Sequence, residues 1–246
     1  MGKRTVTART LRAELKVAMQ QWGWSPSEVV QLLQKSGSRG KGSGYERDVC
    51  KQLSLWWTGG ERDDVFWRSS GSGARATVRG RKGTATAGQY GDVAATDPIG
   101  KPFTDMFTVE VKRGYNDHTI QDLLDCPDDA AIQVWEGFLA QAWGSHKQAG
   151  SYAWMLVIKR DRREALVCIP WYAMLSLTKH GAFGGGWPRR WVRTRAYVRN
   201  ASGAPQAHQV VCLPFADWLA GTPPGAVKAT AKAVKAIARA VLNARY

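Results

Sequence analysis

Residues that hold structural zinc or build a disulfide framework are scarce in this sequence. Its 246 residues include only four cysteines and four histidines, with no Cys-x-x-Cys pair and no histidines grouped beside the cysteines. Structural zinc is therefore not expected. The scattered cysteines are typical of buried, reduced thiols and favour a cytoplasmic protein.

Long apolar runs are absent as well. No stretch near the first residue has the apolar segment of a secretion signal, and no run is long enough to span a bilayer. We therefore expect no membrane partner. The hydrophobic fraction of 44% is ordinary for a globular protein, and the length suffices for a large core with appendages.

Acidic residues are missing from three segments, 65–91, 187–216 and 222–246, and each of these segments carries a charge of +5. Together they account for the net charge of +15. Such confinement indicates a surface for a polyanion, and a basic solvated surface is the alternative. The residues that we expect to contact nucleic acid are Arg68, Arg75, Arg79, Arg81, Lys82, Arg189, Arg190, Arg193, Arg195, Arg199, Lys228, Lys232 and Lys235.

Helical patterns dominate the first part of the chain. Residues 8–21 have helical spacing, and Ser25-Pro26-Ser27-Glu28 predicts the start of a helix that runs to about residue 35. The Gly/Ser-rich segment 37–44 predicts a flexible linker. A further helix is expected over 45–57, and its Glu46 is a structural cap, a metal-site carboxylate, or both.

The stretch 88–115 predicts two strands joined by a polar hairpin turn at 97–100, with Asp92 on the first strand. Strand side chains alternate between faces, so Glu110 and Lys112 on the second strand share a face. If the strands pair, Asp92 comes beside Glu110. Two carboxylates and a lysine at one sheet edge are typical of a divalent-metal site with an adjacent cation.

The remaining pattern predicts helices over 131–149 and 170–177 and strands over 152–158 and 164–169. The segment 191–199 alternates strictly, with arginines and aromatic residues on one face. This pattern favours phosphate and base contacts, and an edge strand protected against aggregation is the alternative. A returning strand over 209–213 and a basic helix after Pro224 complete the chain.

This order of elements resembles the PD-(D/E)XK nuclease superfamily over residues 45–177. Gly91-Asp92 stands where the family often has Pro-Asp, and Glu110-Val111-Lys112 is the (D/E)XK element. The segment 68–73 before Asp92 resembles archaeal-type Holliday junction resolvases and small phage-encoded members of the superfamily. Gln148 and Tyr152 are similar to the Gln-x-x-x-Tyr element of RecB-like exonucleases.

The resemblance implies an α/β fold with a restriction-endonuclease-like core, a mixed central sheet flanked by helices. We expect this core at 45–180, after a helical N-terminal extension (1–36) and the linker (37–44). A basic β-hairpin extension (181–221) and a basic helical tail (222–246) are expected to follow it.

The resemblance also implies the chemistry. Asp92, Glu110 and the backbone carbonyl of Val111 would hold Mg²⁺, with Mn²⁺ as a substitute, and Glu46 would complete the carboxylate set. Lys112 would orient or deprotonate the attacking water, or stabilise the developing negative charge.

The expected function is a Mg²⁺-dependent DNA endonuclease, encoded by a phage and acting on branched DNA. A resolvase activity would need two active sites and hence a homodimer. An exonuclease or a restriction-type nuclease is the alternative within the enzyme class. A non-catalytic, basic nucleic-acid-binding protein on a nuclease-like fold is the alternative from another class.

Overall fold

The computed structural model describes residues 26–69, 90–125, 133–199 and 205–243. The chain divides into two units, Met1–Ser43 and Gly44–Tyr246. The described part of the first unit is the beginning of helix α2 (Pro26–Trp57). The predicted helix over 8–21 lies outside the described residues.

Helix α2 corrects the linker prediction. Segment 37–44 is helical, and the helix begun at Pro26 continues through it to Trp57. The segment contains no proline, and a glycine inside a helix costs only about 1 kcal/mol, so the helix can pass through a Gly-rich stretch. The boundary between the two units nevertheless falls at its end, between Ser43 and Gly44.

The second unit is built on a five-stranded mixed sheet in the order β3-β4-β5-β7-β6. Its strands are β3 (Phe107–Arg113), β4 (Ala153–Lys159), β5 (Ala165–Pro170), β6 (Val192–Arg199) and β7 (Pro205–Pro214). The β3–β4 pair is parallel, and all the other pairs are antiparallel. Strands β6 and β7 form the predicted hairpin, and β7 pairs with β5, so the hairpin completes the main sheet.

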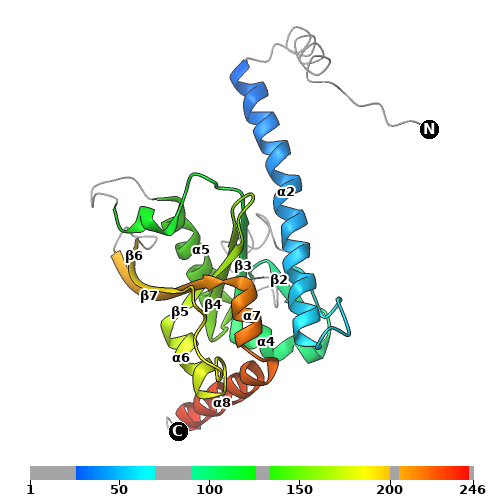
Figure 1. Cartoon of the computed structure of the whole chain (residues 1–246), viewed down its shortest axis with the longest axis vertical. Coiled ribbons are helices and arrows are strands. Elements are labelled where there is room, and N and C mark those ends of the chain that lie inside the picture. The colour runs from blue at the N-terminus through cyan, green and yellow to red at the C-terminus, as the bar shows by residue number, and fades with distance from the viewer. Residues whose placement is uncertain (1–25, 70–89, 126–132, 200–204, 244–246) are drawn as a thin grey trace, which may run out of the picture. The chain divides into compact units, whose positions relative to one another are not determined.

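Helices cover both faces of this sheet (Figure 1). One face packs against α5 (Val134–Ala149), and its core includes Trp154, Leu156 and Ile158 of β4. The other face packs against the C-terminal half of α2 and against α4 (Lys101–Met106), α6 (Trp171–Lys179), α7 (Phe215–Gly221) and α8 (Pro224–Asn243). The predicted α/β fold with a mixed sheet flanked by helices is confirmed.

The hairpin predicted within 88–115, with its turn at 97–100, is wrong. Strand β2 (Val93–Ala95) pairs antiparallel with β1 (Phe66–Arg68) in a separate two-stranded sheet. The 3-10 helix η1 (Pro98–Gly100) and α4 then lead from β2 into β3. Asp97 caps η1, because its carboxylate accepts a hydrogen bond from the Ile99 N–H. A cap followed by proline starts a helix as readily as a turn.

The expectation of reduced cysteines also needs correction. Cys168 of β5 and Cys212 of β7 lie directly opposite each other in the sheet and form a disulfide. The sequence places them 44 residues apart, so only the strand register brings them together. Cys50 is a buried free thiol, as predicted, and Cys126 lies outside the described residues.

A short 3-10 helix, η2 (Ile120–Leu123), precedes α5. Among the residues that the structure describes, no helix is both long enough and apolar enough to cross a membrane.

Candidate active site

Asp92 is held at the open edge of β3 by main-chain contacts. Its N–H donates to the carbonyl oxygen of Val109 at 2.7 Å, and its Oδ2 accepts from the N–H of Val111 at 2.7 Å. Its own carbonyl accepts from the N–H of Ser69 at 3.0 Å. The carboxylate therefore lies beside the Glu110-Val111 peptide, as the sequence predicted, although β2 and β3 are not joined by a hairpin.

Gly91 explains why proline is absent before this aspartate. Its φ is +77°, and a β-carbon there would lie 2.7 Å from the carbonyl oxygen of Val109 and 2.8 Å from Cγ2 of Thr108. Proline fixes φ at about −65° and cannot adopt this conformation. The close approach of backbone to β3 therefore requires glycine at position 91.

Glu110 projects from β3 toward α5. Its partner in the register is Leu156, which belongs to the core beneath α5, and its side chain is almost fully buried. Oε1 accepts a hydrogen bond from Ser145 Oγ at 2.8 Å, and Oε2 accepts one from Gln141 Nε2 at 2.8 Å. Because an ionised carboxylate has about four lone-pair positions, these bonds leave room for a further ligand.

Lys112 lies on the same face of β3, as the alternation predicted. Its Nζ is 3.3 Å from Glu110 Oε2 and 5.9 Å from the centroid of the Phe138 ring. Only 15% of the Lys112 side chain is exposed. The ammonium group is thus held between the carboxylate and an aromatic wall of α5.

Two carboxylates in one buried place are electrostatically unfavourable, and Asp92 shows the effect. Burial, and then the negative charge of Glu110, raise the pKa of Asp92 from 3.8 to about 7. The Lys112 ammonium and the Val111 N–H oppose this rise. A bound cation would relieve the same repulsion.

The role of Glu46 in completing the carboxylate set stays a prediction, and the structure shows where this side chain lies. It lies in α2 and forms an ion pair with the guanidinium of Arg68 on β1. Its charge still reaches Asp92, whose pKa it raises slightly. Within the residues that the structure describes, no three acidic, histidine or cysteine side chains come together as a metal cluster.

The donor set nevertheless fits a hard divalent cation. Mg²⁺ prefers oxygen ligands and commonly binds through one or two carboxylates, completing its shell with water and substrate phosphate. Asp92 and Glu110 supply two carboxylates. The Val111 carbonyl leaves β3 on the same edge as its N–H, which is the edge that Asp92 occupies.

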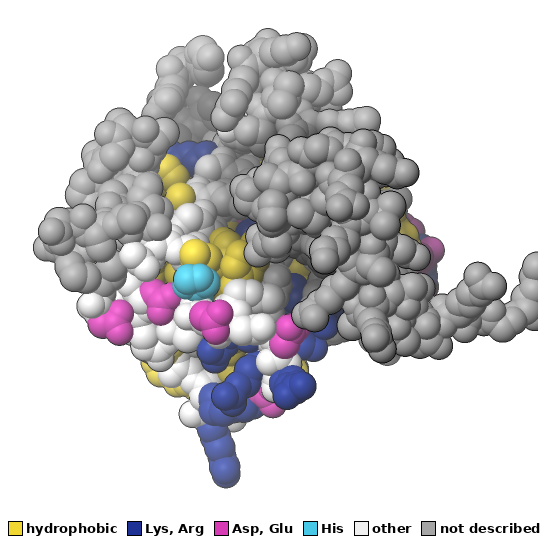
Figure 2. Space-filling view, turned by 90° about the horizontal axis from the view of Figure 1, so that it is seen from above, with side chains coloured by type: hydrophobic (Ala, Val, Ile, Leu, Met, Phe, Trp, Pro, Cys, Tyr) yellow, Lys and Arg dark blue, Asp and Glu magenta, His cyan; other side chains and the backbone are white. Residues whose placement is uncertain are grey.

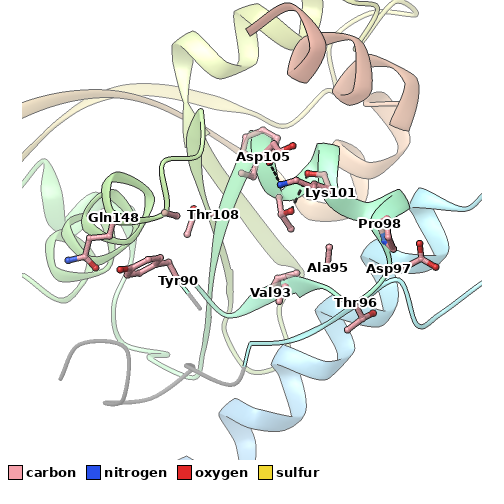
Figure 3. Close-up of a pocket in the computed structure, with 14 residues that line it drawn as sticks. Tyr90, Val93, Ala95, Thr96, Asp97, Pro98, Lys101, Asp105, Thr108 and Gln148 are labelled. Carbon is pink, nitrogen blue, oxygen red and sulfur yellow. Dashed lines mark hydrogen bonds and ion pairs between the residues drawn. The ribbon is translucent and has the colours of Figure 1, made fainter. Parts of the chain in front are cut away.

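A pocket of about 700 Å³ opens beside the Asp92 segment, between β2, α4, the start of β3 and the end of α5. Figure 3 shows Tyr90, Thr108 and Gln148 at one end of this pocket and Thr96, Asp97 and Pro98 at the other. Lys101 and Asp105, one turn apart on α4, form an ion pair at 2.8 Å along one side of the pocket. Gln148 thus lines the pocket, whereas the Tyr152 hydroxyl bonds Ser176.

The predicted DNA-contacting residues are distributed over several surfaces. Arg75, Arg79, Arg81 and Lys82 lie outside the described residues, as does the side chain of Arg199. Arg68 pairs with Glu46, and Lys235 pairs with Asp105. Arg190 contacts Glu164 at 2.7 Å and Asp217 at 3.7 Å. The remaining predicted residues all occupy exposed positions: Arg189, Arg193, Arg195, Lys228 and Lys232.

Basic and acidic side chains are mixed on one face of the molecule. On the face shown in Figure 2, lysine and arginine side chains gather in the lower part, and acidic side chains lie among and above them. The acid-free segments of the sequence therefore meet acids from other parts of the chain once folded, as the pairs of Arg190 illustrate.

Gln141 and Ser145 are the site residues that the sequence reasoning missed. They lie four residues apart on α5, beside the stripe of buried residues that faces the sheet. Polar residues at i and i+4 along the margin of an apolar stripe are the signal that could have indicated them, because they share one side of the helix.

The mixed sheet, with an aspartate beside a Glu-x-Lys strand, defines a fold and site of the PD-(D/E)XK nuclease type. Residues 37–224 match the family described as "Phage putative PDDEXK endonuclease", and the chain belongs to this family. No curated protein and no solved structure matches the chain.

Proposed function

We propose that the chain is a divalent-metal-dependent DNA endonuclease that hydrolyses phosphodiester bonds. The observation that carries this proposal is the placement of Asp92 against the Glu110-Val111-Lys112 strand at the open edge of β3. Membership of the phage PDDEXK endonuclease family supports it independently.

Each residue of this arrangement has a role in the proposal. Asp92, Glu110 and the Val111 carbonyl would hold the metal ion, which would neutralise charge at the phosphorus and lower the pKa of a bound water. Lys112 orients the attacking water or stabilises the charge that develops on the phosphoryl oxygens. Gln141 and Ser145 donate hydrogen bonds that fix the orientation of the Glu110 carboxylate, which would be a metal ligand.

Glu46 has a supporting role in this proposal. Its ion pair with Arg68 holds β1 against α2 next to Asp92. The Glu46 carboxylate would act on the metal through a hydrogen bond accepted from a bound water. Mg²⁺ is the proposed cofactor, and Mn²⁺ substitutes because both prefer oxygen ligands. Branched DNA of phage replication is the proposed substrate, on the resemblance to junction-resolving enzymes, and a homodimer would supply the second cut.

The test is a cleavage panel with the purified full-length chain. Linear duplex, single strand, flap, four-way junction and closed circular DNA are each incubated with Mg²⁺, with Mn²⁺ and with EDTA. We expect internal cleavage with either metal, none in EDTA, and the highest rate on a branched substrate. Nicking of the closed circle distinguishes an endonuclease from an exonuclease.

Lys112→Ala provides the residue-level test, with Lys179→Ala as the matched control on an exposed position of α6. We expect Lys112→Ala to lower the cleavage rate by about 10²–10⁴-fold and Lys179→Ala to leave it unchanged. Equal cleavage by Lys112→Ala and the unaltered chain would overturn the mechanism. Salt-sensitive DNA binding without any cleavage would instead identify a non-catalytic binding protein on this fold.

A further inference from the structure

Three tryptophan side chains from separate segments meet on the surface. Trp171 begins α6, Trp187 lies in the loop before β6, and Trp191 directly precedes β6. Their ring centroids are 4.9 Å (Trp187–Trp191), 5.8 Å (Trp171–Trp187) and 6.5 Å (Trp171–Trp191) apart. Trp187 is 38% and Trp191 44% exposed, although tryptophan is usually highly buried. We call these three residues the tryptophan cluster.

A buried aromatic residue supports the tryptophan cluster on its inner side. The buried ring of Phe183 lies parallel to Trp187, with centroids 5.3 Å apart. Phe183 is fixed in turn by the hydrogen bond from its N–H to the carbonyl of Gly221 on α7. The exposed indoles are therefore positioned before any ligand arrives, which reduces the entropy cost of binding.

Basic groups lie directly against the tryptophan cluster. The guanidinium carbon of Arg193 is 4.4 Å from the centroid of the Trp171 ring, and Arg193 also donates to Gln209 at 2.6 Å. Arg195 and Tyr197 follow on the same exposed face of β6, with the Arg195 guanidinium carbon 5.8 Å from the Tyr197 centroid. The row of exposed side chains thus has two arginines, Arg193 and Arg195, between the aromatic rings of Trp191 and Tyr197.

A pocket of about 750 Å³ adjoins Trp187, and its lining includes Phe183, Arg189 and Arg190. Asp217 also lines this pocket and pairs with Arg190, so Arg190 adds little positive charge there. The exposed Arg189 is the cation that this pocket offers to an anion.

This surface is separate from the candidate active site. Arg193 lies opposite Val211, which belongs to the core beneath α6 and α7, whereas Glu110 lies opposite Leu156 in the core beneath α5. The two surfaces are therefore on different faces of the sheet. They are also at opposite edges, because β3 and β6 are the two outer strands, about 19 Å apart at about 4.8 Å per strand.

We propose that the tryptophan cluster, with Arg193, Arg195 and Tyr197, binds single-stranded DNA by stacking its unpaired bases. Indole rings stack on any base, and each stacked base contributes about five- to 150-fold in affinity, whereas duplex bases already stack on one another. Charge complementarity favours a nucleic acid over a protein partner, because Arg189, Arg193 and Arg195 are exposed on or beside this surface.

The choice of DNA rests on the proposed function. On that basis the substrate carries an unpaired segment in addition to the strand that is cut. The tryptophan cluster would hold this segment on one face of the sheet while cleavage takes place on the other.

The test measures binding of a fluorescent oligo-dT and of a duplex of equal length by anisotropy, with the full chain in EDTA so that no cleavage occurs. We expect the double variant Trp187→Ala/Trp191→Ala to bind oligo-dT at least 10-fold more weakly and the duplex less than threefold more weakly. Trp187→Phe/Trp191→Phe should recover most of the loss, because phenylalanine keeps a π-face.

Leu175→Ala is the matched control, because Leu175 is a large apolar residue of α6 with 42% exposure that is not part of the tryptophan cluster. It should bind oligo-dT like the unaltered chain. Unchanged oligo-dT binding by the folded double alanine variant would overturn the proposal, as would an equal loss in Leu175→Ala. A change of oligomeric state on gel filtration without loss of oligo-dT binding would identify a protein interface and also overturn it.

The binding test is independent of cleavage. If the chain binds oligo-dT through the tryptophan cluster but cuts nothing in Mg²⁺, the proposed nuclease function fails and this inference stands. If the chain cuts DNA while the double alanine variant binds oligo-dT normally, this inference fails and the proposed nuclease function stands.

Discussion

Asp92 is a carboxylate of the candidate site whose surroundings disfavour its negative charge. Its carboxylate is buried beside Glu110, and this raises its pKa from 3.8 to about 7. Between these two pH values the folded chain retains a proton that the unfolded chain has released. The free energy of unfolding therefore falls as the pH rises from about 4 to about 7. Below pH 4 both states are protonated, and this contribution vanishes.

The first prediction concerns the cost of this buried charge. In EDTA at pH 8, Asp92→Asn should be more stable than the unaltered chain by up to about 4 kcal/mol, and the difference should shrink toward pH 4. Thermal melts over pH 4–8 measure it. Addition of Mg²⁺ at pH 8 should stabilise the unaltered chain and not Asp92→Asn. Equal responses of the two proteins to Mg²⁺ would contradict metal binding by Asp92.

Gly91 gives the second prediction. Gly91→Ala should destabilise the chain by about 1–3 kcal/mol, because the added β-carbon meets the Val109 carbonyl in a backbone conformation with positive φ. Gly114→Ala is the control, because Gly114 also has a positive φ but nothing lies within 4 Å of its β-carbon position. Urea unfolding compares the two, and an equal loss in both would show that the close approach to β3 is unimportant.

The residues of the candidate site were largely predictable, but their contacts were not. The alternation of β3 predicted that Glu110 and Lys112 share a face, and the structure confirms it. The alternation could not indicate that Glu46 pairs with Arg68, because that contact depends on how α2 lies against β1. In the sequence Gly91 is only a departure from the family pattern, whereas its positive φ makes it a local requirement.

At the level of elements, residues on one side of helix α5 position the carboxylate of the candidate site. Its residues Trp135, Phe138, Leu139 and Ala142 are buried and form the stripe that faces the sheet. The polar residues beside this stripe reach Glu110, which a helical pattern alone does not reveal because the strand facing them comes from elsewhere in the chain.

The third prediction concerns Gln141 and Ser145 on this helix. Gln141→Ala/Ser145→Ala should lower the Mg²⁺ affinity and the cleavage rate by about 10–100-fold, because Glu110 loses two hydrogen bonds that orient it. Calorimetric titration with Mg²⁺ measures the affinity without reference to activity. Lys147→Ala, at an exposed position of the same helix, should leave both unchanged, and Ser145→Thr should retain most of the effect of the hydroxyl.

The segment between β2 and β3 shows why a hairpin was predicted and a helix was formed. Asp97-Pro98 begins a turn or a helix equally well, and the packing of the next residues decides between them. Here Phe103 and Met106 of α4 are fully buried, and Phe103 contacts Phe66 and Phe107 at ring-centroid distances of 5.0 and 5.8 Å. Tertiary packing therefore determines the local structure.

At the scale of the whole chain, the net charge of +15 predicted a polyanion surface, but charge along the sequence does not equal charge on the surface. Arg190 and Arg189 are adjacent, yet the guanidinium of Arg190 contacts Glu164 and Asp217, whereas Arg189 is exposed beside the pocket next to the tryptophan cluster. The acids come from the turn before β5 and from α7, so the acid-free segment predicts the number of cations and not which of them remain available.

This adjacent pair supports the fourth prediction. Each cation that contacts a DNA phosphate adds about 0.9 to the slope of log affinity against log salt for duplex DNA and about 0.7 for a single strand. Arg189→Ala should therefore reduce the slope for oligo-dT by about 0.7, while Arg190→Ala should reduce it by much less, because its charge is already compensated. Anisotropy titrations between 50 and 200 mM salt in EDTA measure both slopes. If Arg190→Ala changed the slope as much as Arg189→Ala, the ion pairs of Arg190 would have to open when DNA binds. Both adjacent arginines would then be available to DNA, and this prediction would be wrong.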